Sequence, residues 1–166
     1  MPSLHRTFVR GASVLLLASL AACAALRSTS TLPPDTTLAD ARQSFGGAEY
    51  PLPGGGTRLE IRQGRATQML DFDASGRYVG TQQVLTPQTF ATITPGMSQQ
   101  DVLTRIGRPA FVFPVGWQQL QVWNYRFGGL EGDCVVFQVS ISNATHTVTD
   151  AGPNTDPACD HGPDRS

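Results

Sequence analysis

The feature that most constrains the fold of this 166-residue chain is a pattern that runs through it twice. Each copy starts with a short amphipathic segment that ends at glycine, as a helix would. A short segment with aromatic residues and proline follows, and then three segments whose apolar residues are typical of β-strands. The pattern therefore predicts two tandem units, each with one helix and an antiparallel sheet.

The second copy is the clearer of the two. A turn over residues 94–98 ends in a serine that can cap a helix, and Asp101 stands where its carboxylate can accept backbone N–H groups. Apolar residues within 102–106 supply the buried face of this helix. Gly107 ends it, and Pro109 prevents its continuation. In the first copy, the corresponding helix covers residues 38–45.

Strands are predicted from alternation and from the turns between segments. In one of them Trp123, Tyr125 and Phe127 alternate with polar residues, so one face carries three aromatics, which we expect to lie beneath the helices. Phe72 of the first copy and Phe137 of the second are expected at equivalent places. The predicted strands cover residues 50–53, 58–63, 67–73 and 77–84 in the first copy, and 111–114, 120–127, 134–141 and 145–149 in the second.

These elements predict an α+β fold with a two-layer sandwich, in which the two units can share one sheet. The first repeat is expected over residues 38–86 and the second over residues 87–149. A tail over residues 150–166, rich in glycine, proline and aspartate, follows.

The N-terminus is typical of an export signal. Its apolar run of roughly ten residues is shorter than the about 20 residues that a membrane-spanning helix needs. The segment Leu20–Cys23 resembles the lipobox of bacterial lipoproteins, in which cleavage precedes a cysteine that then carries the lipid. We expect residues 1–22 to be removed, Cys23 to be acylated, and residues 23–37 to form a flexible tether. The alternative is an ordinary secretory signal cut near Ala22.

Charge and cysteine content narrow the function further. Without residues 1–22 the chain has ten arginines and thirteen acidic residues, which does not favour nucleic-acid binding. If Cys23 is lipidated, Cys134 and Cys159 remain as a pair in an oxidising compartment, and we expect a disulfide between them. This disulfide would close a loop of about 26 residues, and on the chain-entropy estimate it would stabilise the folded protein by roughly 3–4 kcal/mol. Two free thiols are the alternative.

No group of residues predicts catalysis, a cofactor or a metal site. Asp71 and Asp73 share a strand face but lie beside a hairpin turn, and His146 has no nucleophile pattern near it. The acidic residues of the tail match no calcium-binding loop. We therefore expect a protein that is not an enzyme. Trp117, in a turn, is the candidate for contact with a partner.

The second copy carries a pattern of spaced residues, namely Gly96, Met97, Ser98, Val102, Gly107, Pro109, Trp123 and Tyr125. This pattern resembles the small-protein-A/OmlA lipoproteins, the BamE-like family. The resemblance covers residues 88–149 and implies a small lipoprotein on the periplasmic face of the outer membrane. The best-known member of the family is an accessory subunit of the machinery that assembles β-barrels.

The resemblance implies an outer-membrane-anchored module for protein–protein interaction or scaffolding, whose only cofactor is the lipid on Cys23. Its expected partners are the membrane and an envelope protein, such as the β-barrel assembly machinery. Residue 24 is alanine and not the aspartate that retains lipoproteins in the inner membrane of enteric bacteria. The doubled unit also resembles β-lactamase inhibitor protein, in which two related repeats bind an enzyme through a sheet. An inhibitory or binding module for a periplasmic enzyme is therefore the alternative.

Overall fold

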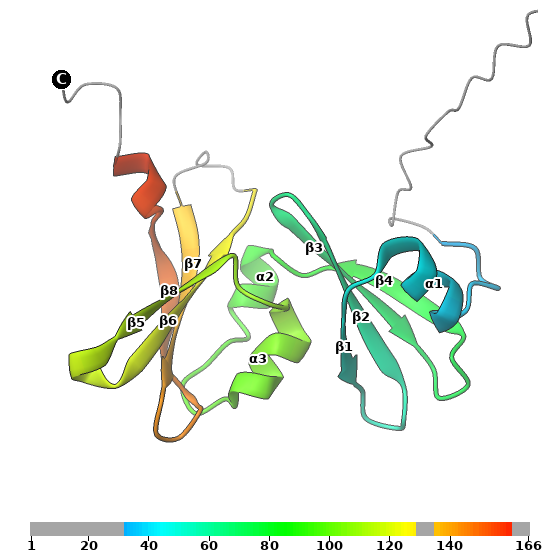
Figure 1. Ribbon diagram of the computed structural model, residues 1–166, viewed down its shortest axis with the longest axis horizontal. Coiled ribbons are helices and arrows are strands. Elements are labelled where there is room, and N and C mark those ends of the chain that lie inside the picture. Colours follow the sequence, from blue (N-terminus) through cyan, green and yellow to red (C-terminus); the bar gives the residue numbers. More distant parts are fainter. Residues whose placement is uncertain (1–31, 129–134, 161–166) are drawn as a thin grey trace, which may run out of the picture.

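The computed structural model describes residues 32–128 and 135–160 (Figure 1). It holds two four-stranded antiparallel sheets, and in each sheet the strands follow one another in sequence order. The first unit comprises α1 (Leu38–Phe45), β1 (Ala48–Pro51), β2 (Thr57–Gln63), β3 (Ala66–Phe72) and β4 (Tyr78–Gln83). The second comprises α2 (Pro87–Phe90), α3 (Gln99–Ile106), β5 (Phe111–Val115), the 3₁₀ turn η1 (Gly116–Gln118), β6 (Leu120–Arg126), β7 (Val135–Ser142), β8 (Val148–Thr155) and the 3₁₀ turn η2 (Pro157–Asp160).

The main helices of the two units begin in the same way. The Thr37 hydroxyl accepts the Asp40 N–H at 3.2 Å before α1, and the Ser98 hydroxyl accepts the Asp101 N–H at 3.1 Å before α3. Each capping hydroxyl also donates to the aspartate that follows it, at 2.6 Å and 2.7 Å respectively. In each unit a short polar residue thus caps one free N–H of the first turn, and the aspartate that carries this N–H fixes the capping hydroxyl.

Both helix starts are fixed to the last hairpin of their own sheet. Thr37 forms an isolated bridge with Arg77 just before β4, and Ser98 forms one with Thr147 just before β8. The residue before each partner has a positive φ, which is 76° at Gly76 and 54° at His146. The two units therefore share local geometry at positions where their residue identities differ.

The elements form alternating layers, in the order α1, first sheet, α2 with α3, second sheet (Figure 1). Leu59, Leu70 and Phe72 point toward α1 and form one core with Ala41. The other core lies around α2 and α3 and takes residues from both sheets. Its members are Tyr50, Met69, Val84, Leu85, Phe90, Ile93, Val102, Ile106, Trp123, Tyr125, Phe137, Val139, Ile141 and Val148.

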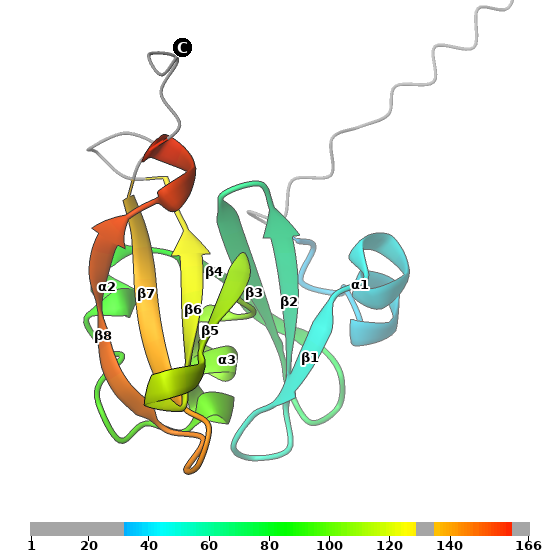
Figure 2. The same ribbon diagram turned by 60° about the vertical axis from the view of Figure 1, so that its left-hand side comes forward.

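The expectation of one shared sheet in a two-layer sandwich was wrong, because β4 and β5 belong to separate sheets. The connection between these strands contains α2 and α3, which occupy the space between the sheets (Figures 1 and 2). Phe90 of α2 stacks on Phe137 of the second sheet with ring centroids 4.2 Å apart. The helices thus separate the sheets and fill the space between them with side chains.

Two further details differ from the sequence-based expectations. The bulge between Asp71 and Phe72 corresponds to the one between Ser140 and Ile141, so the counterpart of Phe72 is Ile141 and not Phe137. The last strand continues to Thr155, into the segment expected to be a tail. Glycine and proline at residues 152 and 153 are tolerated there because β8 is an edge strand.

Candidate functional site

The family-pattern residues before α3 build a turn. Pro95 and Gly96 occupy its centre, and Gly96 has φ +87°, the left-handed conformation that a type II turn requires. The Gly96 N–H donates to the Val148 carbonyl at 2.8 Å, and the Met97 carbonyl accepts the Val148 N–H at 2.8 Å. Met97 is half-buried against the core. The turn therefore joins the start of α3 to β8.

The pattern residues on and after α3 position the helix between the sheets. Val102 is fully buried, and Gly107 ends the helix with φ +76°. A Cβ on Gly107 would lie 3.0 Å from the Glu60 carboxyl carbon of the first sheet, so the helix end approaches that sheet closely. Pro109 is half-buried just beyond. These residues are part of the packing between the two units.

Trp123 and Tyr125 are core residues, as expected for the face beneath the helices. Trp123 is 4% exposed and Tyr125 is 1% exposed. The Tyr125 hydroxyl donates to the Gly107 carbonyl at 3.0 Å, which links β6 to the end of α3. Burial raises the pKa of this phenol well above its usual value, so it stays protonated. The family-pattern residues thus form structure and not a contact surface.

The opposite face of the second sheet lacks a covering layer among the described residues, and Figure 2 shows it toward the viewer. On this outer face, Phe111 lies opposite Asn124 and Phe113 lies opposite Val122. The rings of Phe111 and Phe113 meet edge to face with centroids 5.2 Å apart, and Phe113 is 48% exposed. The β5 side of the outer face is therefore apolar and solvent-accessible.

The middle of the outer face is polar and internally bonded. The Gln138 amide donates to the Asn124 side-chain oxygen at 2.8 Å, and the Asn154 amide donates to the Gln138 oxygen at 2.7 Å. This amide ladder connects β6, β7 and β8. Asn124 is fully buried and Asn154 is exposed, so each amide orients the next and the ladder fixes the direction of the polar groups at its exposed end on β8.

An ion pair closes the end of this face. The Arg126 guanidinium group donates to the Asp156 carboxylate at 2.5 Å. The central carbon (Cζ) of the same guanidinium group lies 4.7 Å from the centroid of the Phe111 ring. The hydrogen bond with Arg126 lowers the pKa of Asp156 and raises that of Arg126. Asp156 is buried beside η2, so the pair fixes the end of β8 against β6.

Trp117 is the most exposed large apolar side chain among the described residues, at 84%. It lies in η1, between β5 and β6, and Gln119 after it has a left-handed backbone. Val112 is 43% exposed on the other side of β5, which extends beyond the helices. Apolar residues thus gather around one hairpin at the edge of the second sheet.

Three of the four edge strands contain proline: Pro51 in β1, Pro114 in β5 and Pro153 in β8. Proline has no N–H to donate, so these edges are poor templates for an added strand. A partner of the second sheet is therefore expected to contact side chains on the sheet face, and not to pair with backbone at the sheet edge.

The lipidation and disulfide predictions concern residues mostly outside the described part of the chain. Residues 1–22, Cys23 and Cys134 all lie outside it. Cys159 lies in η2 and is disulfide-bonded, with its partner outside the described ranges. The pairing of Cys134 with Cys159 stays a prediction.

The acidic residues considered in the sequence have structural partners. Asp71 pairs with Arg58 at 2.6 Å, and Asp73 accepts the N–H groups of Ser75 and Arg77 in a hairpin turn. Within residues 32–128 and 135–160, no cluster of ligating side chains could hold a metal ion. No helix in this part of the chain is long and apolar enough to cross a membrane.

Sequence reasoning identified the strand that contains Phe111 and Phe113 but did not propose these residues as a contact site. The two-residue spacing of the phenylalanines places both on one face, and this was readable from the sequence. Which face the helices cover depends on the path of the chain between the sheets, which the sequence pattern did not reveal.

Comparison with known proteins adds little. No family model matches the sequence, and no curated protein matches it. Among solved structures, a cysteine-rich secretory protein from Staphylococcus aureus subsp. aureus Mu50 aligns with 11% identity and a TM-score of 0.26. The alignment covers 75% of this chain and 45% of that one, so the chain spans less than half the length of that protein. A likeness this weak carries no argument about fold or function.

Proposed function

We propose that this protein is a lipid-anchored periplasmic module that docks another envelope protein through the outer face of its second sheet. One observation carries the proposal. Phe113 is 48% exposed on this face next to Phe111, which lies opposite Asn124 of the hydrogen-bonded amide ladder, and Trp117 is 84% exposed in the hairpin at the end of β5. Aromatic anchors next to fixed polar groups are the usual composition of the energetic centre of a protein interface.

The proposal does not involve catalysis. The amide side chains of the outer face are hydrogen-bonded to one another, and Arg126 at the end of this face is paired with Asp156. A surface of this kind recognises shape and hydrogen-bond direction, since it offers a partner anchors and a polar rim. We accordingly propose a binding protein and not an enzyme, with no cofactor beyond the lipid.

The location is proposed from the N-terminal sequence. A lipid on Cys23, followed by the 23–37 tether, would hold the domain near the outer membrane while leaving the sheet accessible. The BamE-like pattern supports the same location, and β-barrel assembly is the process we propose for the partner. Membership of that family is part of the proposal.

The alternative is a binding or inhibitory module for a soluble periplasmic enzyme. The observation that favours it is the architecture of two units, each with four antiparallel strands, and the resemblance of the doubled unit to β-lactamase inhibitor protein. The two proposals use the same outer face and differ in the partner.

The anchor is tested by Cys23→Ser. We expect the variant to move from the membrane fraction to the soluble periplasmic fraction and to lose incorporation of labelled palmitate, because the thiol that takes the lipid is gone. Cys159→Ser, which leaves Cys23 intact, is the matched control and should stay with the membrane. Retention of the Cys23→Ser protein in membranes would refute the lipid anchor.

The partner class is tested by capture with the acylated, affinity-tagged protein. Recovery of β-barrel assembly subunits with wild type, and their loss with Phe113→Ser, supports the first proposal. Recovery of a soluble hydrolase under the same conditions supports the alternative. Equal recovery with Phe113→Ser and wild type would contradict docking through the outer face in either case.

A further inference from the structure

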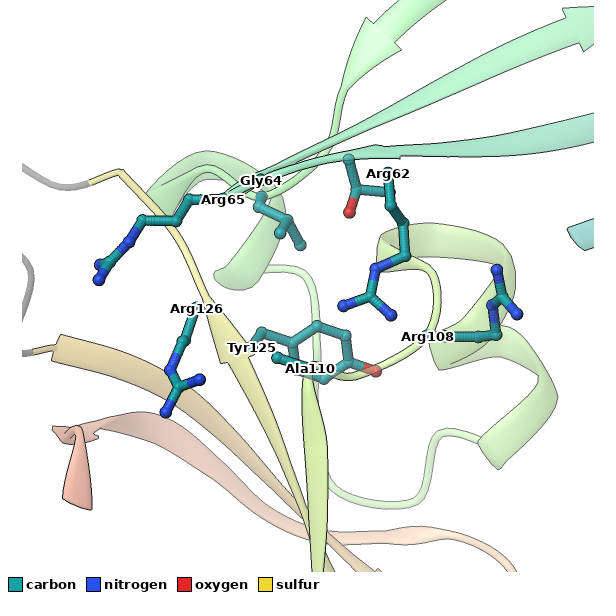
Figure 3. Close-up of a pocket in the computed structure, with 9 residues that line it drawn as sticks. Arg62, Gly64, Arg65, Arg108, Ala110, Tyr125 and Arg126 are labelled. Atoms are coloured by element: carbon teal, nitrogen blue, oxygen red, sulfur yellow. The ribbon is translucent and has the colours of Figure 1, made fainter. Parts of the chain in front are cut away.

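A cleft of about 270 Å³ opens where the two units meet. It lies between the β2–β3 hairpin of the first unit and β6 of the second, and Tyr125 and Ala110 line one side (Figure 3). Four arginines also line it, Arg62 and Arg65 from the first unit and Arg108 and Arg126 from the second. Four arginine side chains around one small cavity concentrate positive charge in a chain of net charge −1, and two of these charges are paired with acids.

Two of these arginines are held in place by buried acids. Arg108 contacts Glu60 at 3.3 Å, and the Glu60 side chain is fully buried and also accepts the Tyr50 hydroxyl at 2.6 Å. Arg126 is held by Asp156, whose side chain is 2% exposed. Because Glu60 is fixed, the Arg108 guanidinium group attached to it is preorganised and needs little ordering to bind a ligand, whereas the Arg126 guanidinium group is directed to Asp156 and the Phe111 ring.

Arg62 is different. It makes no hydrogen bond or ion pair within residues 32–128 and 135–160, although its side chain points into the cleft from β2 (Figure 3). In Figure 3 its guanidinium group is drawn next to Tyr125, whose hydroxyl donates to the Gly107 carbonyl. The donors of Arg62 are therefore available to a ligand in the cleft.

We propose that this cleft binds one small, doubly charged oxyanion of the phosphate or sulfate kind, with Arg62 as its principal ligand and Arg108 supporting it. Guanidinium groups bind such anions through paired N–H donors. The cavity is smaller than the roughly 300–1,000 Å³ typical of sites for drug-sized molecules, which suits a single tetrahedral anion. A doubly charged ligand suits a cleft whose arginines come from both units, since it can contact both at once.

This site goes beyond the proposed docking function and does not depend on it. A bound anion would connect the β2–β3 hairpin to the start of β5 and the end of β6. Binding would stabilise the folded chain in proportion to occupancy. Failure of anion binding would leave the docking proposal untouched, because docking is tested by partner capture with Phe113→Ser and anion binding by titration with Arg62→Gln.

The test is calorimetric titration of the folded full-length mature protein with sodium phosphate and sodium sulfate. Ionic strength is held constant with sodium chloride, so that general screening does not change. We expect one site with a Kd of about 0.1–1 mM, and weaker binding of sodium acetate, which carries one charge. Arg62→Gln should weaken phosphate binding at least about tenfold. Arg77→Gln, which alters an exposed arginine in a hairpin turn, is the matched control and should leave binding unchanged.

A measurement on wild type makes the result independent of any variant. In amide and arginine side-chain NMR spectra, phosphate should shift the Gly64 and Ala110 N–H signals and the Arg62 Nε–H signal along one saturable curve. Absence of saturation up to about 10 mM phosphate, or acetate binding as tightly as phosphate, would overturn the proposal. So would phosphate binding by a folded Arg62→Gln protein that equals that of wild type.

Discussion

Glu60 is the residue at which the two units depend on each other most directly. Its fully buried carboxylate accepts the Tyr50 hydroxyl from its own sheet and the Arg108 N–H from beyond α3, at 2.6 Å and 3.2 Å. A buried carboxylate is stable only when such donors replace its lost hydration. Glu60 therefore favours the arrangement in which the end of α3 lies against the first sheet.

We predict that Glu60→Gln lowers the free energy of unfolding by about 1–3 kcal/mol. The amide keeps the shape of the side chain but loses the charge and offers an N–H₂ group to the donors around it. The measurement is urea unfolding at neutral pH. The control is Glu49→Gln, which breaks an exposed pair with Arg42 and should cost less than about 1 kcal/mol. Equal costs for the two variants would show that Glu60 does not join the units.

The sequence predicted the strand that contains Glu60 but not the burial of its side chain. The partners of this carboxylate lie 10 and 48 residues away, and no local pattern indicates such distant donors. Trp117 is the opposite case. Its position in a short turn was enough to predict exposure, because turns offer a large ring little to pack against.

At the scale of elements, the two main helices end on equivalent glycines in different surroundings. Gly46 after α1 and Gly107 after α3 have φ values of 66° and 76°, where a side chain is strained. A Cβ on Gly46 would meet nothing within 4 Å, whereas one on Gly107 would lie 3.0–3.1 Å from side-chain atoms of Glu60, Met69 and Thr67. The difference reflects the position of α3 between two sheets.

Gly46→Ala and Gly107→Ala consequently form a matched pair. With ψ values of −155° at Gly46 and −166° at Gly107, both positions lie in a region open essentially to glycine alone, so both variants should be destabilised by backbone strain of about 1–3 kcal/mol. Gly107→Ala should lose about 1–3 kcal/mol more, because the methyl group forces the facing side chains apart. Chemical unfolding of both variants measures the difference, and a Gly107→Ala protein as stable as Gly46→Ala would contradict the close approach of α3 to the first sheet.

The last strand is fixed by the pair between Arg126 and Asp156, which predicts acid sensitivity. The hydrogen bond with Arg126 lowers the pKa of Asp156 in the folded protein, so the folded state holds this proton less readily than the unfolded state. The resulting stability is present above the unfolded pKa of about 3.9 and is lost as pH falls through the folded-state pKa.

Urea midpoints of wild type and Asp156→Asn, measured from neutral to acid pH, test this linkage. Wild type should be the more stable above about pH 4, and the two curves should converge below it. Asp35→Asn, at an exposed turn residue, should run parallel to wild type throughout. A gap between wild type and Asp156→Asn that persists unchanged into strong acid would contradict the role of the ionised pair.

For the whole molecule, the sequence predicted the α+β class and the repeated order of helix and strands, because caps, glycine stops and alternation are local signals. It did not predict α2 or the separation of the sheets. Both depend on side chains such as Phe90, which stacks on Phe137 far along the chain. The candidate contact surface was missed in part for the same reason, since Phe111 and Phe113 face outward only once α2 and α3 lie on the other side.

Among residues 32–128 and 135–160, no layer of helix or sheet covers the outer face of the second sheet, while helices lie on both faces of the first sheet (Figures 1 and 2). Prolines on three edges discourage strand addition. Together these features direct binding to one face of one sheet, which is the central claim about function.

Site-specific photo-crosslinking in living cells tests this claim most directly. A photoreactive phenylalanine derivative is placed at Phe113, at Trp117, or at Val79, an exposed residue of β4 in the first sheet that serves as control. We predict one discrete crosslinked protein from positions 113 and 117 and none from position 79. No crosslink at 113 and 117 in a folded, membrane-associated protein, or the same products from position 79, would contradict docking through the outer face.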